Sequence, residues 1–438
     1  MAGTMVTRRE FLAAGAASLL AGAGRAATGA NADVQRALDG YLSAGLFGGI
    51  VCTSTAGALY AGGRQTLAVD SPAMASDSLF DLASIGKTQT AALCALLAAQ
   101  GRLDVDAPFT EYVTEHVLAK ENCTITVRDL ATHSGGFDNS KPYQVADVDE
   151  FFAKLYAKRP VRARGAAYEY ACSNFIYLGL VVEKITGMDL DTAAKQMLWG
   201  PLGMNATTWN TVVGNPRAVE YAASTYGGPT RRIGEHNDLT CYYAPRPTGN
   251  GSNFSTAPDM QLFVNDMLTR RTFPQAYYDL QFAESFNKGG YRRSFGWDMT
   301  GAHSTFSSWT PTRFSDSAIC HTGWTGGAIA VDPANGFAGV VMASQKAGKE
   351  ATMGPRMQLL DLMAFGRKRA SCIIDGTLER GPSGTGASSA GAAVSACASV
   401  PCDGASTTAF DSRRGSEALS RMIALDTRRA TALSILFR

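Results

Sequence analysis

The chain contains few histidines and cysteines, and those it has are not grouped. Five histidines and nine cysteines are scattered over 438 residues, without a C-x-x-C pair or an H-E-x-x-H motif. The sequence therefore predicts no metal site, and we expect no cofactor. It also lacks a G-x-S-x-G elbow and a G-x-x-x-x-G-K-[ST] loop, which argues against an α/β-hydrolase nucleophile turn and against a phosphate-binding loop.

Charge is sparse and balanced. Charged residues make up 18% of the chain and hydrophobic residues 45%, with a formal net charge of +2. This composition is typical of a folded globular protein with a large core. There is no basic block, so we expect no nucleic-acid partner. No internal segment is long and apolar enough to span a bilayer, so we expect no stable membrane insertion. The oligomeric state does not follow from the sequence.

The cysteines define no disulfide framework. They occur without regular spacing at Cys52, Cys94, Cys123, Cys172, Cys241, Cys320, Cys372, Cys397 and Cys402. We expect most of them to be buried free thiols. Disulfides in an oxidising compartment stay an open alternative, and the sequence does not give their pairing.

Ser84-Ile-Gly-Lys87 has the parts of an acyl-transfer nucleophile. It precedes Thr88–Ala99, a run of good helix formers with apolar residues at helical spacing. A serine at the first turn of a helix and a lysine three residues later share one face. The helix N-terminus provides free N–H groups and partial positive charge. A buried lysine there is expected to have a lowered pKa and to take the proton of the serine.

A second copy of the pattern, Ser285-Phe-Asn-Lys288, is interpreted differently. Gly289 and Gly290 follow it, so no helix can continue beyond the lysine. We interpret Ser285 as a structural or surface residue. His133 is also interpreted as structural, because its Thr-His-Ser-Gly-Gly context predicts a helix end and a turn.

Two later segments complete a known order of motifs. One contains Tyr170-Ala-Cys172, and the other is His321-Thr-Gly-Trp324, followed by the strand-like Ala328–Pro333. The order Ser-x-x-Lys, Tyr-x-Asn, Lys/His-Thr-Gly is that of the serine β-lactamase and penicillin-binding protein superfamily. The chain resembles the class C-related serine hydrolases and esterases of that superfamily.

The resemblance covers residues 35–368. Further segments match family motifs in the same order, at 101–108, 125–136, 254–260, 295–298 and 332–333. A chance match to one such motif is easy, whereas a match to all of them in order is specific.

The resemblance implies a role for each site residue. Ser84 Oγ would attack a carbonyl, and Lys87 would act as its base. Tyr170 would pass a proton to the leaving group and later activate water. The N–H groups of Ser84 and Trp324 would form the oxyanion hole. The expected substrate and oxyanion residues are His321, Thr322, Gly323, Trp324 and Cys172.

Two positions depart from the family pattern. Cys172 takes the place of the asparagine, and a thiol cannot supply the two strong donors of an amide. The alternative register, Cys172-Ser-Asn174, lacks the tyrosine. His321 stands where β-lactamases and D-alanyl-D-alanine peptidases usually have lysine, a permanent cation for the substrate carboxylate, and histidine is mostly neutral at pH 7. Both changes favour an ester or a small amide as substrate.

The two ends of the chain differ from its middle. Residues 1–32 contain Thr7-Arg-Arg-Glu-Phe-Leu12 before an Ala-, Leu- and Gly-rich stretch, which resembles a twin-arginine export signal. We therefore expect a periplasmic or secreted protein; a coincidental basic pair in a cytosolic chain is the alternative. Residues 369–438 form a low-complexity tail that we expect to be disordered.

Residues 33–368 are predicted to form one hydrolase domain of the α+β class. Strands are predicted within 48–70, with Gly48-Gly49 and Gly62-Gly63 as turns, and within 318–345. Helices are predicted at 88–100, 147–158, 175–186, 189–198, 257–270 and 354–368. This order favours a β-lactamase-like fold: an antiparallel β-sheet flanked by helices, with a mostly helical second subdomain and the active site between the two parts.

We therefore expect an exported serine hydrolase that forms an acyl-enzyme on Ser84 and hydrolyses a small-molecule ester, amide or peptide-like substrate. One alternative is a β-lactamase or D-alanyl-D-alanine carboxypeptidase. Another is a catalytically silent protein that binds cell wall or a partner protein. The complete set of Ser84, Lys87 and Tyr170 argues against the silent protein, because a binder needs no nucleophile with its base.

Overall fold

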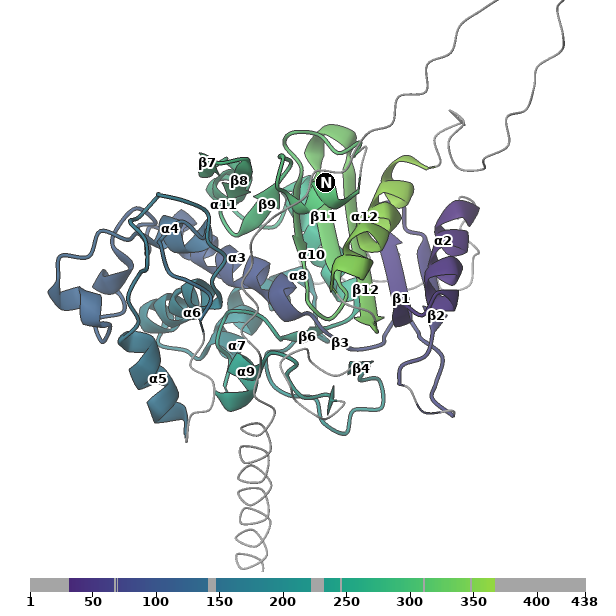
Figure 1. Cartoon of the computed structure of the whole chain (residues 1–438), viewed down its shortest axis with the longest axis horizontal. Helices are drawn as coiled ribbons and strands as arrows, with labels where there is room; N and C mark the ends of the chain where they lie inside the picture. The colour runs from purple at the N-terminus through teal and green to yellow at the C-terminus, as the bar shows by residue number, and fades with distance from the viewer. Residues whose placement is uncertain are drawn as a thin grey trace, which may run out of the picture. The chain divides into compact units, whose positions relative to one another are not determined.

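The structure of the chain is a computed structural model (Figure 1). It describes residues 31–366, except residues 67, 69, 141–146, 222–231, 245, 310–311 and 347–348. The expected tail at 369–438, and all but the last two residues of the expected export signal, lie outside the described residues.

An eight-stranded antiparallel sheet organises the domain, with strand order β2-β1-β12-β11-β10-β9-β8-β7. The strands are β1 (Phe47–Ser54), β2 (Leu59–Gly63), β7 (Phe286–Lys288), β8 (Tyr291–Ser294), β9 (Trp297–Met299), β10 (Ile319–Thr322), β11 (Ala328–Asp332) and β12 (Phe337–Gln345). The antiparallel sheet predicted from the sequence is therefore confirmed. The short strands β7, β8 and β9 were not predicted.

Helices cover both faces of this sheet. α2 (Ala32–Ser43) and α12 (Lys349–Phe365) pack against it together, and α10 (Ala257–Thr269) packs against it separately (Figure 1). In β12, Val341 belongs to the core cluster of α2 and α12, whereas Val340 belongs to the cluster that contains α10. Successive side chains of a strand point to opposite faces, so the two sets of helices lie on opposite faces.

A mostly helical second part is inserted between β2 and β7. Its helices are α3 (Gly86–Ala99), α4 (Val127–Ala131), α5 (Val148–Tyr156), α6 (Cys172–Thr186), α7 (Leu190–Ala194), α8 (Gly200–Leu202), α9 (Leu239–Tyr243) and α11 (Gln275–Phe282). Two-stranded sheets join β3 (Phe80–Asp81) to β6 (Phe254–Ser255) and β4 (Glu220–Tyr221) to β5 (Arg232–Ile233). α3 is buried from Gly86 to Leu97. It packs against α6 and α11, as expected of a helix that is apolar on all sides.

Several predicted boundaries were wrong. Gly48 and Gly49 lie inside β1, while Gly62 and Gly63 end β2. Gly49 pairs with Gly63, and a Cβ on Gly63 would lie 2.3 Å from Gly48 O. These glycines therefore permit close strand contact and do not form the turns.

Three predicted helices also differ in extent. α6 begins at Cys172, and α12 begins at Lys349. The predicted helix 189–198 divides into α7 and a π-helical turn, Lys195–Trp199. None of the described helices is long and apolar enough to cross a bilayer. The cysteines in the described part of the chain are free thiols: Cys52, Cys94, Cys123, Cys172, Cys241 and Cys320.

Candidate active site

Ser84 lies in a tight turn that is held from both sides. It is the middle residue of the 3-10 turn Ala83–Ile85, directly before α3. Ala83 has a φ of 46°, a left-handed conformation that is uncommon for a residue with a Cβ. Its N–H donates to Asp81 Oδ1 at 2.7 Å, and its carbonyl accepts from the Ser252 N–H at 3.0 Å. Strained turns of this kind cluster at functional sites.

Lys87 and Tyr170 both contact Ser84. Lys87 Nζ lies 3.1 Å from Ser84 Oγ, and Tyr170 Oη lies 2.6 Å from the same oxygen. Lys87 is fully buried. Its three ammonium protons have three acceptors, namely Ser84 Oγ, the Asn250 carbonyl and Cys172 Sγ, which is 3.7 Å away.

The pKa of Lys87 lies above its ordinary value. Burial by itself lowers this pKa, but the attraction of the facing Cys172 and Tyr170 side chains, with a smaller contribution from Asp238, raises it more. The lowered pKa predicted from the sequence was therefore wrong. Neighbours that only the folded chain brings together outweigh the effect of burial.

The turn between β10 and β11 packs against the nucleophile turn. A Cβ on Gly323 would lie 2.4 Å from Leu82 O, so only glycine permits this approach. The contact brings Trp324 and Ser84 to the wall of one cavity. This is the side of Ser84 on which the oxyanion N–H groups are expected.

Arg356 of α12 holds that turn from behind, and the sequence did not indicate this. Its side chain is fully buried, and Nη1 donates to the carbonyls of Gly323 at 2.7 Å and Gly327 at 3.0 Å. Its Nη2 donates to Thr352 Oγ1 at 2.9 Å. Burial lowers the pKa of Arg356 to about 10, which leaves the guanidinium charged at neutral pH.

A cavity of about 330 Å³ opens in front of Ser84. Residues of both parts line it: Ala83, Ser84, Asn139, Tyr168, Tyr170, Cys172, Asn237, Asp238, Tyr291, Arg293, Asp298, His303, Thr305, His321, Thr322, Trp324 and Met353. Lys87 and Gly323 lie outside this lining, next to it. In the described part of the chain, no group of three or more His, Cys, Asp or Glu residues could hold a metal ion.

Cys172, and not Asn174, stands beside Ser84. Cys172 lines the cavity and contacts Lys87, whereas Asn174 is fully buried and its Nδ2 lies 3.1 Å from His133 Nδ1. The structure thus supports the register with Cys172 in the asparagine place. His133 is fully buried, and its ring centroid lies 4.5 Å from that of Tyr170, which fits the structural role predicted for it.

A buried cation that the sequence did not indicate lies in the cavity wall. Arg293 of β8 is 4% exposed, and its Nη1 lies 3.3 Å from Asp298 Oδ1. Its guanidinium carbon is 5.3 Å from the ring centroid of Tyr168. Its Nε and Nη2 have no hydrogen-bond partner among the described residues. His321, at the end of β10, is also buried, and its Nδ1 lies 2.9 Å from Thr322 O.

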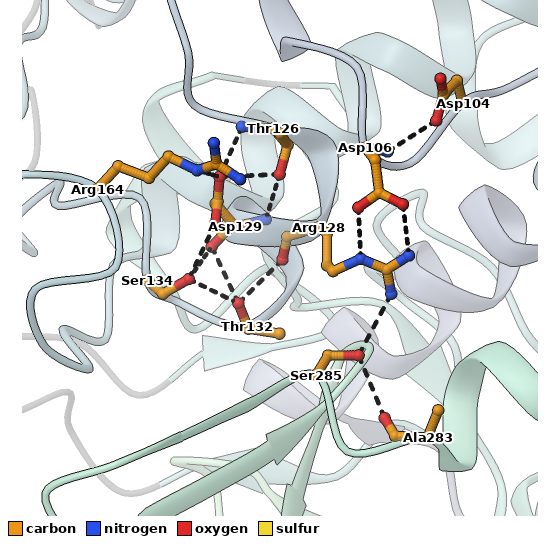
Figure 2. Close-up of polar contacts among 10 residues, drawn as sticks. All are labelled: Asp104, Asp106, Thr126, Arg128, Asp129, Thr132, Ser134, Arg164, Ala283 and Ser285. Carbon is orange, nitrogen blue, oxygen red and sulfur yellow. Dashed lines mark hydrogen bonds and ion pairs between the residues drawn. The ribbon is translucent and has the colours of Figure 1, made fainter.

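The second Ser-x-x-Lys pattern forms no such site. Figure 2 shows Ser285 between the Ala283 carbonyl, to which its Oγ donates at 3.2 Å, and Arg128, whose Nη1 donates to it at 3.4 Å. Arg128 in turn forms a bidentate pair with Asp106. Lys288 donates to the Gly165 carbonyl at 3.2 Å. The structural interpretation of Ser285 agrees with these contacts.

A serine in contact with a lysine and a tyrosine, in a cavity between an antiparallel sheet and a helical part, defines a serine hydrolase of the β-lactamase-like fold. The sequence profile of the Beta-lactamase family matches residues 35–362. The chain therefore belongs to the beta-lactamase family of serine hydrolases.

Individual relatives are distant and differ in their described activities. The N-acetylmuramyl-L-alanine amidase of Bacillus subtilis (strain 168) is 28% identical over 309 residues, which are 62% of this chain and 69% of the amidase. The crystal structure of a beta-lactamase from Sulfitobacter sp. EE-36 has a TM-score of 0.62 at 23% identity and covers 77% of this chain and 99% of its own. The structure of EstCE1, a hydrolase with promiscuous acyltransferase activity, has a TM-score of 0.63 at 16% identity. It covers 76% of this chain and 97% of its own.

Proposed function

We propose that this protein hydrolyses an ester or small amide through an acyl-enzyme on Ser84. The observation that carries the assignment is the contact of Ser84 Oγ with both Tyr170 Oη, at 2.6 Å, and Lys87 Nζ, at 3.1 Å. A hydroxyl held between a phenol and a buried ammonium can lose its proton without leaving an uncompensated charge in the site.

We assign the proton transfers to Tyr170, because its Oη contacts Ser84 Oγ at 2.6 Å and the pKa of Lys87 is raised. Tyr170 acts as the general base and takes the proton of Ser84 while Oγ bonds to the substrate carbonyl carbon. The N–H groups of Ser84 and Trp324 stabilise the oxyanion, each contributing about 3 kcal/mol. Tyr170 then gives the proton to the leaving group as that bond breaks. It next takes a proton from water, which attacks the acyl group, and returns a proton to Ser84 Oγ. Lys87 stays protonated throughout and balances the charge on Tyr170.

His321 and Cys172 support an ester or small amide as the substrate. Neither residue offers the fixed cation or the amide donors that a β-lactam would use at these places. Esters and small amides require only the nucleophile, the proton shuttle and the oxyanion N–H groups.

A β-lactamase or D-alanyl-D-alanine carboxypeptidase is a second candidate, and Arg293 favours it. This buried cation has two N–H-bearing atoms without partners among the described residues. It could hold a substrate carboxylate in the place of the lysine that residue 321 lacks.

Mass spectrometry after incubation with a fluorophosphonate, and separately with a penicillin, tests both candidates. We expect the fluorophosphonate adduct on the Ser84 peptide, its loss in Ser84→Ala and its retention in the control Ser285→Ala. A stable or rapidly turned-over penicilloyl adduct on Ser84 would support the second candidate. An adduct on Ser285, or none on Ser84, would contradict the proposed nucleophile.

We also propose that the protein is exported, on the basis of Thr7-Arg-Arg-Glu-Phe-Leu12. The double variant Arg8→Lys and Arg9→Lys keeps the charge but removes the arginine pair. It should accumulate in the cytoplasm, as measured by fractionation against the unaltered chain. Equal export of both would contradict a twin-arginine signal.

A further inference from the structure

Asn139 supplies an amide to the cavity at the point where Cys172 cannot. Cys172 is the first residue of α6, and the preceding Ala171 makes no side-chain cap. The Cys172 N–H instead donates to Asn139 Oδ1 at 2.9 Å. This bond satisfies one of the N–H groups that a helix leaves unpaired at its N-terminus.

The bond also fixes which end of the Asn139 amide is free. A backbone N–H can only donate, so the oxygen of the amide must face it. Asn139 is solvent-exposed and lines the same cavity as Ser84. Its Nδ2 donates to no group in the described part of the chain. Two N–H donors are therefore available for a ligand.

The position of Asn139 is set by its neighbours in sequence. Lys158 Nζ bonds to Asp138 Oδ1 at 2.5 Å and to the Ser140 carbonyl at 2.8 Å. The Lys158 side chain is only 11% exposed, and Phe137 is fully buried. The residues on either side of Asn139 are thus anchored to one lysine, and the amide is held from the loop and from α6 together.

We propose that Asn139 determines specificity by donating to a carbonyl oxygen in the acyl part of the substrate. The substrate class is then an ester or amide whose acyl group itself carries an amide, such as an N-acylated amino acid. This assignment rests on the proposed hydrolase function. The oxyanion N–H groups take the scissile carbonyl, so Nδ2 requires a second acceptor. We place that acceptor in the acyl part because only this part stays bonded to Ser84 through both steps.

The experiment compares ethyl N-acetylglycinate with ethyl pentanoate, which has the same chain length without the amide. The ratio of their kcat/KM values is measured by titrating released acid, in the wild type and in Asn139→Asp. Aspartate keeps an oxygen for the Cys172 N–H but has no N–H donors. We expect the ratio to fall about tenfold in Asn139→Asp. Comparing ratios between variants removes the intrinsic reactivity of each ester.

Asn215→Asp is the matched control, because Asn215 Oδ1 also accepts a backbone N–H, that of Arg217 at 3.0 Å, outside the cavity. Its ratio should equal that of the wild type. Cys172→Asn added to Asn139→Asp should restore the ratio, because it returns an amide to the same place.

Two results would overturn the assignment of Asn139. One is an unchanged ratio in Asn139→Asp. The other is a fall in kcat/KM of Asn139→Asp that affects only 2-acetamidoethyl butanoate, an ester that carries the amide in its alcohol part. If the wild type hydrolyses none of these esters through Ser84, the proposed hydrolase function fails. If Ser84 hydrolyses them with an unchanged ratio, only the role of Asn139 fails.

Discussion

The spacing of Lys87 and Tyr170 from Ser84 in the sequence does not decide which of the two side chains moves the proton. The three acceptors around Lys87 Nζ and its raised pKa make it a fixed cation. In the proposed mechanism the phenol of Tyr170, whose Oη lies 2.6 Å from Ser84 Oγ, exchanges the Ser84 proton. A buried ammonium facing a phenol stabilises the negative charge that this exchange creates.

Tyr170→Phe should lower kcat by about 10²- to 10⁴-fold, because it removes the general base and acid.

Lys87→Met, which keeps an unbranched buried side chain, should lower kcat as well. Since the pKa of Lys87 is raised, the ammonium persists through neutral pH, and the loss of activity that follows its deprotonation should occur only at strongly alkaline pH. Steady-state kinetics against pH on a short ester measures both effects. If Tyr170→Phe keeps the kcat of the wild type, Tyr170 takes no part in the mechanism.

His321 and Cys172 should set the preference between esters and β-lactams. In the wild type, kcat/KM for p-nitrophenyl butyrate should exceed that for nitrocefin. His321→Lys combined with Cys172→Asn should move the ratio toward nitrocefin by about ten- to a hundredfold, because each change restores a strong hydrogen bond to the β-lactam. If the wild type already prefers nitrocefin, the β-lactamase candidate replaces the esterase, with Arg293 as the carboxylate-binding cation.

At the scale of elements, α12 acts on the active site across the sheet. Arg356 reaches from this helix to both carbonyls that bracket the β10–β11 turn. The N–H groups of the turn are oriented by the same peptide units. A shift of about 1 Å in such a group can change the rate by about a hundredfold.

Arg356→Met should therefore lower kcat with little change in KM. It should also lower the free energy of unfolding by about 1–3 kcal/mol, because the Gly323 and Gly327 carbonyls lose a buried donor. Arg313→Met is the control: Arg313 binds the same helix through Asp361 but does not contact the turn. It should lose stability while keeping kcat. Equal kcat in Arg356→Met and the wild type would show that the turn needs no support from α12.

At the scale of the whole molecule, Asp81 connects the nucleophile turn with the loop before α9. Its Oδ1 accepts the Ala83 N–H and its Oδ2 the Asn237 N–H, each at 2.7 Å. Burial raises the pKa of Asp81 from 3.8 to about 6, against the lowering effects of the Asn237 N–H and of His236. The folded protein therefore holds the proton of Asp81 to higher pH than the unfolded chain.

This difference makes stability depend on pH in a defined direction. Below the unfolded pKa of 3.8, Asp81 is protonated in both states, and no stability is lost. Between pH 3.8 and about 6 the unfolded carboxyl has ionised while the buried one keeps its proton, so the contribution of Asp81 falls by about 3 kcal/mol over this window and stays constant above it.

Urea unfolding from about pH 4 to about pH 7 measures this slope. Asp81→Asn should lack the decline, and the exposed control Asp316→Asn should show it as the wild type does. The same slope in Asp81→Asn and the wild type would contradict the raised pKa.

Local patterns determined much of this fold. Ser84, in the turn before α3, contacts Lys87 in its first turn, as their three-residue spacing predicted. Ala257–Thr269 and Val148–Tyr156 match the predicted helices because their apolar residues recur at helical period. β7, β8 and β9 were not predicted, because strands of three or four residues contain too few positions to show an alternation of apolar and polar residues.

The sequence by itself predicted Ser84, Lys87 and Tyr170 as one site, and the structure brings these three side chains into contact, whereas Ser285 contacts Arg128. Tertiary structure alone decided the pKa of Lys87, the cation at Arg293, the support by Arg356 and the amide of Asn139. The reason is physical: each depends on side chains far apart in the chain, and the distances that set a field or a hydrogen bond exist only when the sheet and the helical part have packed together.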